Sequence, residues 1–238
     1  MSAPRDLVAA TVRRFQVPDP DATTAAVAAI LEALEREPDP HTTVTKLADA
    51  LDVHVADSLA GLEVPALRQA ANIADIGAGA GFPGLVLAAA LPGARVDLIE
   101  SSRRKCAVID RLAAAAGLQD RARAVPARAE EWAKRGGAGA YDAATARALA
   151  PLPVICEYAA PLLRLGGLLV AWKGARDAQE EHSGHLAAAE LGFGPPDVTP
   201  SNPYRGSENR HLHVYYKVTE TPAKYPRRAG VAAKRPIG

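Results

Sequence analysis

Residues 75–84 read Asp75-Ile76-Gly77-Ala78-Gly79-Ala80-Gly81-Phe82-Pro83-Gly84 and contain four glycines. They follow a short apolar run, residues 72–76, that predicts a β-strand, and they lead into a helix predicted over residues 83–91. A glycine-rich turn between a strand and a helix is where α/β sheets bind nucleotides, because glycine accepts positive φ and lets a ligand approach the backbone. The same pattern also suits a tight connection that binds nothing.

The chain downstream of this turn alternates between strands and helices. Such alternation predicts an α/β domain with a doubly wound, mostly parallel sheet and helices on both faces. A helix predicted over residues 151–164 is expected to stop at Gly166-Gly167. The further predicted strands are residues 95–100, 121–125, 141–145, 168–172 and 211–217, and the further predicted helices are residues 105–116, 130–135 and 177–191.

Upstream, residues 1–70 show helical spacing of apolar residues and no strand pattern. We therefore expect an N-terminal helical extension (1–70), a main domain (71–218) and a C-terminal tail (219–238) that contains three prolines. With 238 residues, 48% hydrophobic and 23% charged, the chain is neither wholly disordered nor collagen-like. Cys106 and Cys156 form no metal-binding or disulfide pattern and are expected to be buried.

The N-terminus and the apolar runs indicate a cytoplasmic protein. Charged residues interrupt the first fifteen positions, so no signal peptide is expected. The longest apolar run, residues 85–91, is far below the roughly 18 residues that span a bilayer. We expect neither a membrane partner nor a bound metal.

The details of the glycine turn narrow its ligand. The dinucleotide pattern G-x-G-x-x-G fails at its third glycine, where Phe82 stands, and no Lys follows as in a phosphate-binding P-loop. Glu100 ends the second strand, where a carboxylate can accept both ribose hydroxyls. These features favour S-adenosylmethionine (AdoMet), a nucleoside without a pyrophosphate, over NAD. Asp75 is expected either to hold the methionyl ammonium or to cap the amides of the turn.

Charge is distributed unevenly. Residues 201–238 carry eight Lys or Arg against two Glu, a net charge of +6, so residues 1–200 sum to −5. A basic end on an acidic body suggests contact with a polyanion, although a solvated tail has the same composition. Lys173, after the fifth strand, is a candidate for an RNA phosphate contact.

Several motifs resemble the ribosomal RNA small-subunit methyltransferase G family, also called glucose-inhibited division protein B. The resemblance runs from about residue 40 to the end. Its segments, besides the glycine turn, are His54-Val55-Ala56-Asp57-Ser58-Leu59, Ala129-Glu130-Glu131-Trp132, Ala146-Arg147-Ala148, Trp172-Lys173-Gly174, Arg210-His211-Leu212, and Tyr225-Pro226-Arg227-Arg228-Ala229-Gly230 with Lys234-Arg235-Pro236. Ala146 departs from the family, where Ser is usual, and Glu100 stands where Asp is common.

The resemblance implies a class I AdoMet-dependent methyltransferase with a Rossmann-like, seven-stranded sheet. Its implied activity is methyl transfer to N7 of a guanine in 16S rRNA, in the 530-loop region near the decoding centre. By matching position, the resemblance implies cofactor contacts at Gly77, Phe82, Ala129, Glu130 and Arg147. The turn and the end of the second strand add Asp75, Gly79 and Glu100 to the expected cofactor-binding residues. The RNA-binding residues are expected to be Lys173, Arg210, Lys224, Arg227 and Arg228.

This chemistry needs no general base, because N7 of guanine carries a lone pair and no proton. Arg147 is then expected to position the guanine or the cofactor, and the enzyme to act as a monomer on the small ribosomal subunit. Gly77→Val is expected to abolish AdoMet binding by filling the ligand's space. The alternatives are a methyltransferase for another RNA or a small molecule, a non-catalytic AdoMet-binding rRNA assembly factor, and an NAD oxidoreductase.

Overall fold

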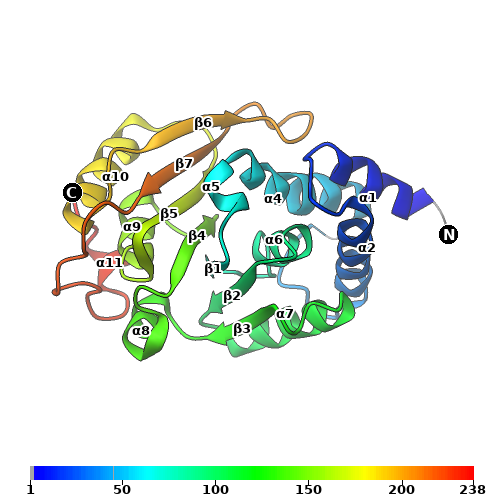
Figure 1. The fold of residues 1–238 in the computed structure, drawn as a ribbon, viewed down its shortest axis with the longest axis horizontal. Coiled ribbons are helices and arrows are strands. Elements are labelled where there is room, and N and C mark those ends of the chain that lie inside the picture. The colour runs from blue at the N-terminus through cyan, green and yellow to red at the C-terminus, as the bar shows by residue number, and fades with distance from the viewer. Residues whose placement is uncertain (1–2, 45) are drawn as a thin grey trace.

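A seven-stranded sheet forms the centre of the computed structural model, which describes residues 3–44 and 46–238 (Figure 1). The strand order is β3-β2-β1-β4-β5-β7-β6, and β3 to β5 run parallel while β7 is antiparallel to both of its neighbours. The strands are β1 (Asn72–Ile76), β2 (Arg95–Glu100), β3 (Ala122–Pro126), β4 (Tyr141–Arg147), β5 (Leu163–Lys173), β6 (Asp197–Ser201) and β7 (Arg210–Tyr216). Since β2 and β4 flank β1 and run parallel to it, their carboxyl ends meet at one edge of the sheet.

Helices cover both faces of the sheet. One face packs against α6 (Gly84–Ala90), α7 (Arg103–Ala115) and the N-terminal helices, and the other against α8 (Ala129–Trp132), α9 (Leu152–Ala159) and α10 (Ala178–Leu191). Side chains cap the starts of α7 and α10: the Ser102 hydroxyl accepts from the Lys105 amide, and the Asp177 carboxylate accepts from two amides of α10. Both cysteines are buried and free, as predicted.

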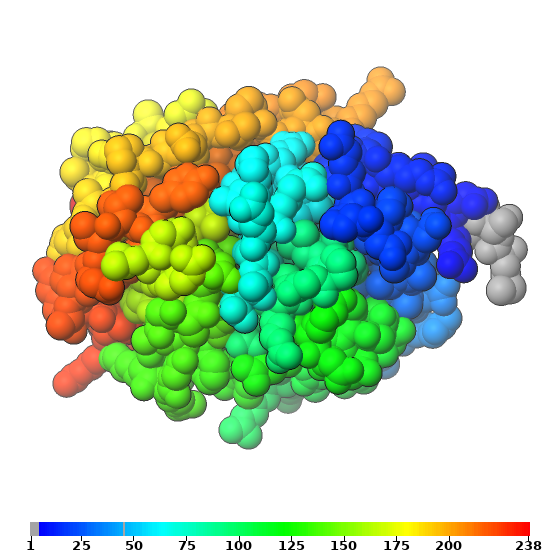
Figure 2. All heavy atoms as spheres, viewed as in Figure 1, coloured from blue at the N-terminus to red at the C-terminus, as the bar shows by residue number. Residues whose placement is uncertain are grey.

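The described residues up to position 70 form helices joined by loops, as predicted. They form α1 (Ala3–Arg13), α2 (Pro20–Arg36), α3 (Leu47–Ala50), α4 (Asp57–Leu59) and α5 (Pro65–Arg68), with a π-helical turn at Leu51–Ala56 and a 3-10 turn at Ala60–Glu63. Val27, Ile30 and Leu59 are fully buried in the same apolar cluster as α6. Figure 2 shows the segments of α1 and α2 (blue) and the C-terminal segment (red) at opposite ends of the long axis.

The predicted helix over residues 151–164 is too long. α9 ends at Ala159, and β5 already begins at Leu163 and runs through Gly166-Gly167. These glycines do not stop a helix; they form an irregularity within the strand, where the β4–β5 register shifts. Gly166 has φ +76°, and a Cβ on Gly167 would lie 2.9 Å from the Asp142 carbonyl oxygen, so both positions require glycine.

Two further elements were not expected from the strand and helix patterns. The edge strand β6 contains Pro200, a residue that is more typical of loops in sequence-based prediction. Proline is tolerated there because one side of an edge strand forms no backbone hydrogen bonds with a neighbouring strand. The C-terminal tail contains a short helix, α11 (Val231–Lys234), whose Ala232 is buried. Over the described ranges, no helix combines the length and the apolarity needed to cross a membrane.

Candidate functional site

A cavity of about 450 Å³ opens at the carboxyl ends of β1, β2 and β4. Seven of the eight predicted cofactor residues line it: Gly77, Gly79, Phe82, Glu100, Ala129, Glu130 and Arg147. The sheet topology explains this convergence, because parallel strands end at the same edge. Because it gathers these predicted residues, we call this space the cofactor cavity. Its lining also includes residues that were not predicted, among them Thr42, His54, Lys105, Leu149 and Tyr158.

The glycine turn forms one wall of the cofactor cavity. Gly77 and Gly79 have φ of +67° and +59°, in the left-handed region that favours glycine. A Cβ on Gly79 would meet nothing closer than 3.9 Å, whereas a Cβ on Gly77 would lie 2.4 Å from Cδ1 of Leu149. Gly77→Val would therefore collide with the protein itself, so it is not the clean test of ligand binding expected from sequence; Gly79 is the better position.

Asp75 does not line the cavity. Its carboxylate is 1% exposed and accepts hydrogen bonds from the Gly84 amide (2.9 Å) and the Thr145 hydroxyl (2.9 Å). Burial raises the pKa of Asp75 to about 6, against the opposing effect of these hydrogen bonds. Of the two roles expected for Asp75, the structure supports the capping carboxylate, here at the first turn of α6, and not direct contact with a ligand.

Glu100 stays on the cavity wall and also fixes the glycine turn. Its Oε2 accepts from the Gly79 amide (3.1 Å), and its Oε1 accepts from the Ser102 amide (2.8 Å). The acid at the tip of β2 is thus held in one orientation by backbone donors of the turn and of the start of α7. A ligand in the cavity would meet a preorganised carboxylate.

The opposite wall is formed by α8 and α9. Ala129 and Glu130 come from α8, and Tyr158 comes from α9. The Glu130 carboxylate is buried and accepts from the amide of Gly230 in the C-terminal tail (2.9 Å). Burial, with the nearby Glu130 charge, raises the pKa of Tyr158.

His54 is a cavity residue to which sequence reasoning assigned no role. Its ring stacks on Phe82 with centroids 4.3 Å apart and 6° between the planes, and its Nε2 lies 3.1 Å from the Thr42 hydroxyl. Burial, followed by the Arg147 charge, lowers the pKa of His54 to about 4, so the ring is neutral at pH 7. In the sequence, the only indication of a role for His54 is that it begins one of the segments that resemble the family.

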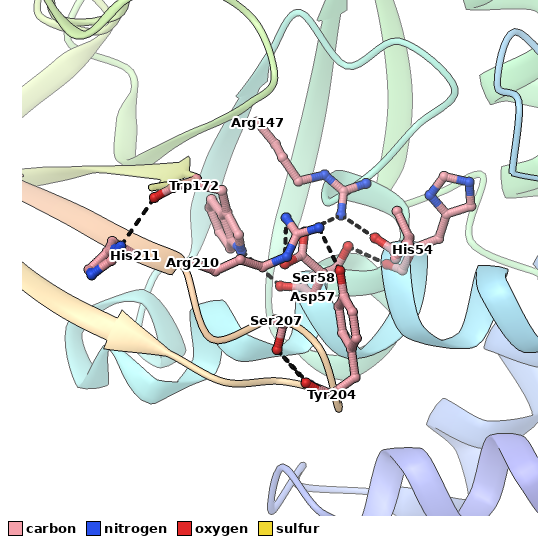
Figure 3. Close-up of polar contacts among 11 residues, drawn as sticks. His54, Asp57, Ser58, Arg147, Trp172, Tyr204, Ser207, Arg210 and His211 are labelled. Atoms are coloured by element: carbon pink, nitrogen blue, oxygen red, sulfur yellow. Dashed lines mark hydrogen bonds and ion pairs between the residues drawn. The ribbon is translucent and has the colours of Figure 1, made fainter. Parts of the chain in front are cut away.

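A polar network surrounds Asp57, whose side chain is almost fully buried (Figure 3). Arg147 donates from Nη1 to Asp57 Oδ2 (2.8 Å) and to the Val53 carbonyl (2.7 Å). Arg210 forms an ion pair with the other carboxylate oxygen, with its Nη1 3.3 Å from Asp57 Oδ1. The Trp172 indole donates to the Asp57 carbonyl (2.8 Å). The network therefore connects α4 to the ends of β4, β5 and β7.

A second cavity, of about 310 Å³, lies next to the cofactor cavity. Its lining is Arg147, Ala148, Leu149, Ala150, Ile155, Trp172, Lys173, Gly174 and Arg210. Residues 147–149 line both cavities, so the loop after β4 is a shared wall. Ala148 has φ +52°, an unusual conformation for a residue with a side chain, and the tight turn there places its neighbours between the two spaces.

The predicted RNA-binding residues fall into two groups. Lys173 and Arg210 line the second cavity, where Lys173 pairs with Glu180 (2.5 Å). The other three, Lys224, Arg227 and Arg228, line a separate groove formed with the C-terminal tail. Within the described ranges, no group of three or more His, Cys, Asp or Glu side chains is arranged to hold a metal ion.

The tail cations differ in what they contact. Lys224 pairs with Glu190 (2.8 Å), and Arg227 pairs with the buried Glu157. Arg228 is exposed, and its guanidinium has no ion-pair partner among residues 3–44 and 46–238. The tail is therefore attached to the body of the protein, and Arg228 is the cation of these three that no carboxylate of the described residues pairs with.

Comparison with known proteins agrees with this geometry. A family model described as GidB, rRNA small subunit methyltransferase G, matches residues 41–198. Ribosomal RNA small subunit methyltransferase G of Rubrobacter xylanophilus is 45% identical over 188 residues, which cover 77% of this chain and 72% of that protein. The protein of the same name from Synechococcus elongatus is 38% identical over 200 residues, covering 83% and 82%.

A solved structure shares the fold. It is an Agrobacterium tumefaciens protein described as a predicted O-methyltransferase, with TM-score 0.55 and 24% identity over 69% of this chain and 81% of that chain. Together with the strand order, these findings confirm the predicted α/β fold of class I AdoMet-dependent methyltransferases.

Proposed function

The chain belongs to the rRNA small subunit methyltransferase G family, and we propose that it transfers a methyl group from AdoMet to N7 of a guanine in the 530-loop region of 16S rRNA, near the decoding centre. It is an AdoMet-dependent methyltransferase of small-subunit rRNA. We further propose that it acts as a monomer in the cytoplasm, with the small ribosomal subunit as its partner.

The cofactor cavity fits AdoMet. The open space at the Gly79 Cα admits a ligand against the backbone of the turn, where any side chain would intrude. Glu100 presents a fixed carboxylate for the ribose hydroxyls, and Phe82 and Ala129 offer apolar surface for the adenosine. Glu130 lies on the same wall as Ala129. Asp75 stabilises the end of the turn by accepting a hydrogen bond from the Gly84 amide.

The observation that carries the proposal is the wall shared by the two cavities. A purine in the second cavity would lie beside the cofactor cavity, at residues 147–149, which border both spaces. When bound, AdoMet supplies an electrophilic methyl group on a sulfonium. The protein's task is then to hold N7 at attack distance, about 3–3.5 Å, and in line. No side chain has to accept a proton.

Arg147 is suited to that positioning role. Asp57 and the Val53 carbonyl engage its Nη1, and no described residue accepts a hydrogen bond from its Nε or Nη2. These groups are free to donate to the guanine O6, an acceptor that arginine commonly reads. Because the Asp57 carboxylate is itself held by Arg210, the guanidinium of Arg147 is fixed before a substrate arrives.

The basic residues support an RNA substrate. Lys173 and Arg210 lie at the second cavity, where they would contact phosphates that flank the guanine. Lys224, Arg227 and Arg228 were predicted to make further phosphate contacts. Of these three, Arg228 is the one that is exposed and has no ion-pair partner in the described part of the chain.

Mass mapping of 7-methylguanine in 16S rRNA tests the proposal. A strain that lacks this gene should lose one such mark in the 530-loop region, and the wild-type gene should restore it. Methyl incorporation into naked rRNA, 30S particles and 70S ribosomes identifies the assembly state of the substrate. Retention of every 7-methylguanine mark would overturn the N7 assignment, and a lost mark elsewhere would overturn the site.

A further inference from the structure

The C-terminal segment, residues 222–238, is tied to both helices that form the far wall of the cofactor cavity. Gly230 donates its amide to Glu130 of α8 (2.9 Å). Arg227 donates from its side chain and its amide to Glu157 of α9. Glu130 lines the cavity, and Glu157 is the immediate neighbour of the lining residue Tyr158. Figure 1 shows the red segment running past α9 toward α8.

The Arg227–Glu157 pair has more hydrogen bonds than the Gly230–Glu130 attachment. Glu157 is 1% exposed, and each of its carboxylate oxygens accepts from the guanidinium of Arg227. A buried carboxylate that loses its ion-pair partner is left as an uncompensated charge, and hydrating that charge would displace α9. Among the described residues, Arg227 is the only cation paired with Glu157.

The rest of the segment also packs against the body of the protein. Lys224 and the Tyr225 hydroxyl both reach Glu190 of α10, and Ala232 of α11 is buried. Ile237 packs against the same apolar cluster that contains Ala129 and Cys156 of the cavity-side helices. The segment therefore behaves as part of the fold, with contacts at both ends and in the middle.

We infer that residues 222–238 form a strap that positions the α8–α9 wall for AdoMet, with Arg227 as its main positioning residue. Arg227 acts on the cofactor through Glu157 and Tyr158, without touching the cavity itself. The inference rests on the proposed assignment of this cavity to AdoMet. It gives Arg227 a different role from the RNA contact expected from its charge alone.

Calorimetric titration of the full-length protein with AdoMet tests the strap. Arg227→Met should raise the Kd for AdoMet about tenfold, the usual size of coupling between two sites. Arg235→Met is the matched control: it removes an exposed guanidinium from the same segment, with no ion-pair partner in the described chain, and should leave the Kd unchanged. The double variant Arg227→Met/Glu157→Gln should recover most of the affinity, because no buried charge is left unpaired.

Kinetics separate positioning from general loss of structure. In Arg227→Met, KM for AdoMet should rise while kcat and KM for the small subunit stay near their wild-type values. If Arg227→Met does not fold, Arg227→Lys, which keeps the charge but loses the two-pronged geometry, should give a rise of about threefold in Kd.

Three outcomes would count against an assignment. A wild-type Kd for AdoMet in the folded Arg227→Met protein, or in Arg227→Lys, overturns the strap. An unchanged Kd combined with a reduced salt dependence of RNA binding overturns it in favour of a phosphate contact by Arg227. Failure of the wild-type protein itself to bind AdoMet overturns the cofactor assignment, and is therefore distinguishable from failure of the strap.

Discussion

The Nη1 atom of Arg147 lies 2.8 Å from the carboxylate of Asp57, although 90 positions separate the two residues in the sequence. Asp57 belongs to the N-terminal helical region and Arg147 to the end of β4. The pair therefore holds the helical region against the edge of the sheet where both cavities open. Figure 3 shows Arg210 approaching the same carboxylate from β7.

Arg147→Met should reduce both stability and activity. It leaves the buried Asp57 with Arg210 alone, so the free energy of unfolding should fall by about 3 kcal/mol, as for other broken buried pairs. Loss of substrate positioning should reduce kcat about a hundredfold. Urea unfolding and methyl transfer to small subunits measure the two effects. Arg176→Met is the control, because Arg176 forms an exposed pair with Glu181 and should change either quantity little. A kcat within twofold of wild type would remove Arg147 from the site.

Gly79→Ala should weaken AdoMet binding at least tenfold. The atom nearest to the added methyl group is the Gly77 carbonyl oxygen, 3.9 Å away, so its effect on binding arises in the ligand's space. The left-handed φ of +59° should also cost about 1 kcal/mol of stability. Gly139→Ala is a matched control: its φ is +60°, its Cβ meets nothing within 4 Å, and it lies outside the cofactor cavity. Titration with AdoMet and urea unfolding should show equal destabilisation but a binding defect only at Gly79. Normal affinity in Gly79→Ala would contradict the cavity assignment.

His54 should make the protein less stable as pH falls. Its pKa is about 4 in the native state and about 6.5 when unfolded, so between these values the unfolded chain binds more protons. Stability from this group is complete above pH 6.5 and is lost as pH falls through 4, by up to about 3 kcal/mol. Asp75, with its pKa raised to about 6, acts in the opposite direction between pH 4 and 6.

The difference between wild type and His54→Gln isolates the histidine from Asp75. The unfolding free energy of the variant should decline less steeply between pH 6.5 and 4. The same substitution at exposed His182 is the control. Parallel pH profiles for wild type and His54→Gln would show that His54 titrates alike in both states.

Arg228→Met should reduce the salt dependence of RNA binding. Each phosphate contact contributes about 0.7–0.9 to the slope of log affinity against log salt concentration, depending on whether the RNA is single- or double-stranded. Because the Arg228 guanidinium is exposed, one such contact should disappear in the variant. AdoMet affinity should stay the same, the reverse of the result expected for Arg227→Met. An unchanged slope would mean that Arg228 does not contact phosphate.

Sequence alone located the elements around the glycine turn closely. The observed β1 and β2 coincide with the predicted ranges, residues 72–76 and 95–100. The predicted helix over 83–91 begins and ends within one residue of α6. These elements depend on local signals, namely short apolar runs, a glycine turn and the spacing between them. Seven of the eight predicted cofactor residues line one cavity, because parallel strands bring their carboxyl ends together at one edge of the sheet.

Local patterns misled where a contact from elsewhere in the chain set the conformation. Gly166-Gly167 predicts the end of a helix. Backbone hydrogen bonds to Lys217, some 50 positions later in the sequence, instead hold these glycines within β5. The residues around Asp75 do not distinguish its two predicted roles, ligand contact and capping. Its hydrogen bond from Thr145 on the neighbouring strand, which holds the carboxylate as a buried cap, depends on the tertiary structure.

The order of strands and helices and the glycine turn with its carboxylate can thus be read from adjacent residues, because each depends on backbone geometry over a few positions. Adjacent residues do not reveal four other features: the second cavity, the stack of His54 on Phe82, the Asp57 network and the attachment of Arg227 to Glu157. Each joins side chains from separate elements, and burial decides whether a charge such as Arg227 faces solvent or a carboxylate. That burial exists only once the helices have packed on the sheet.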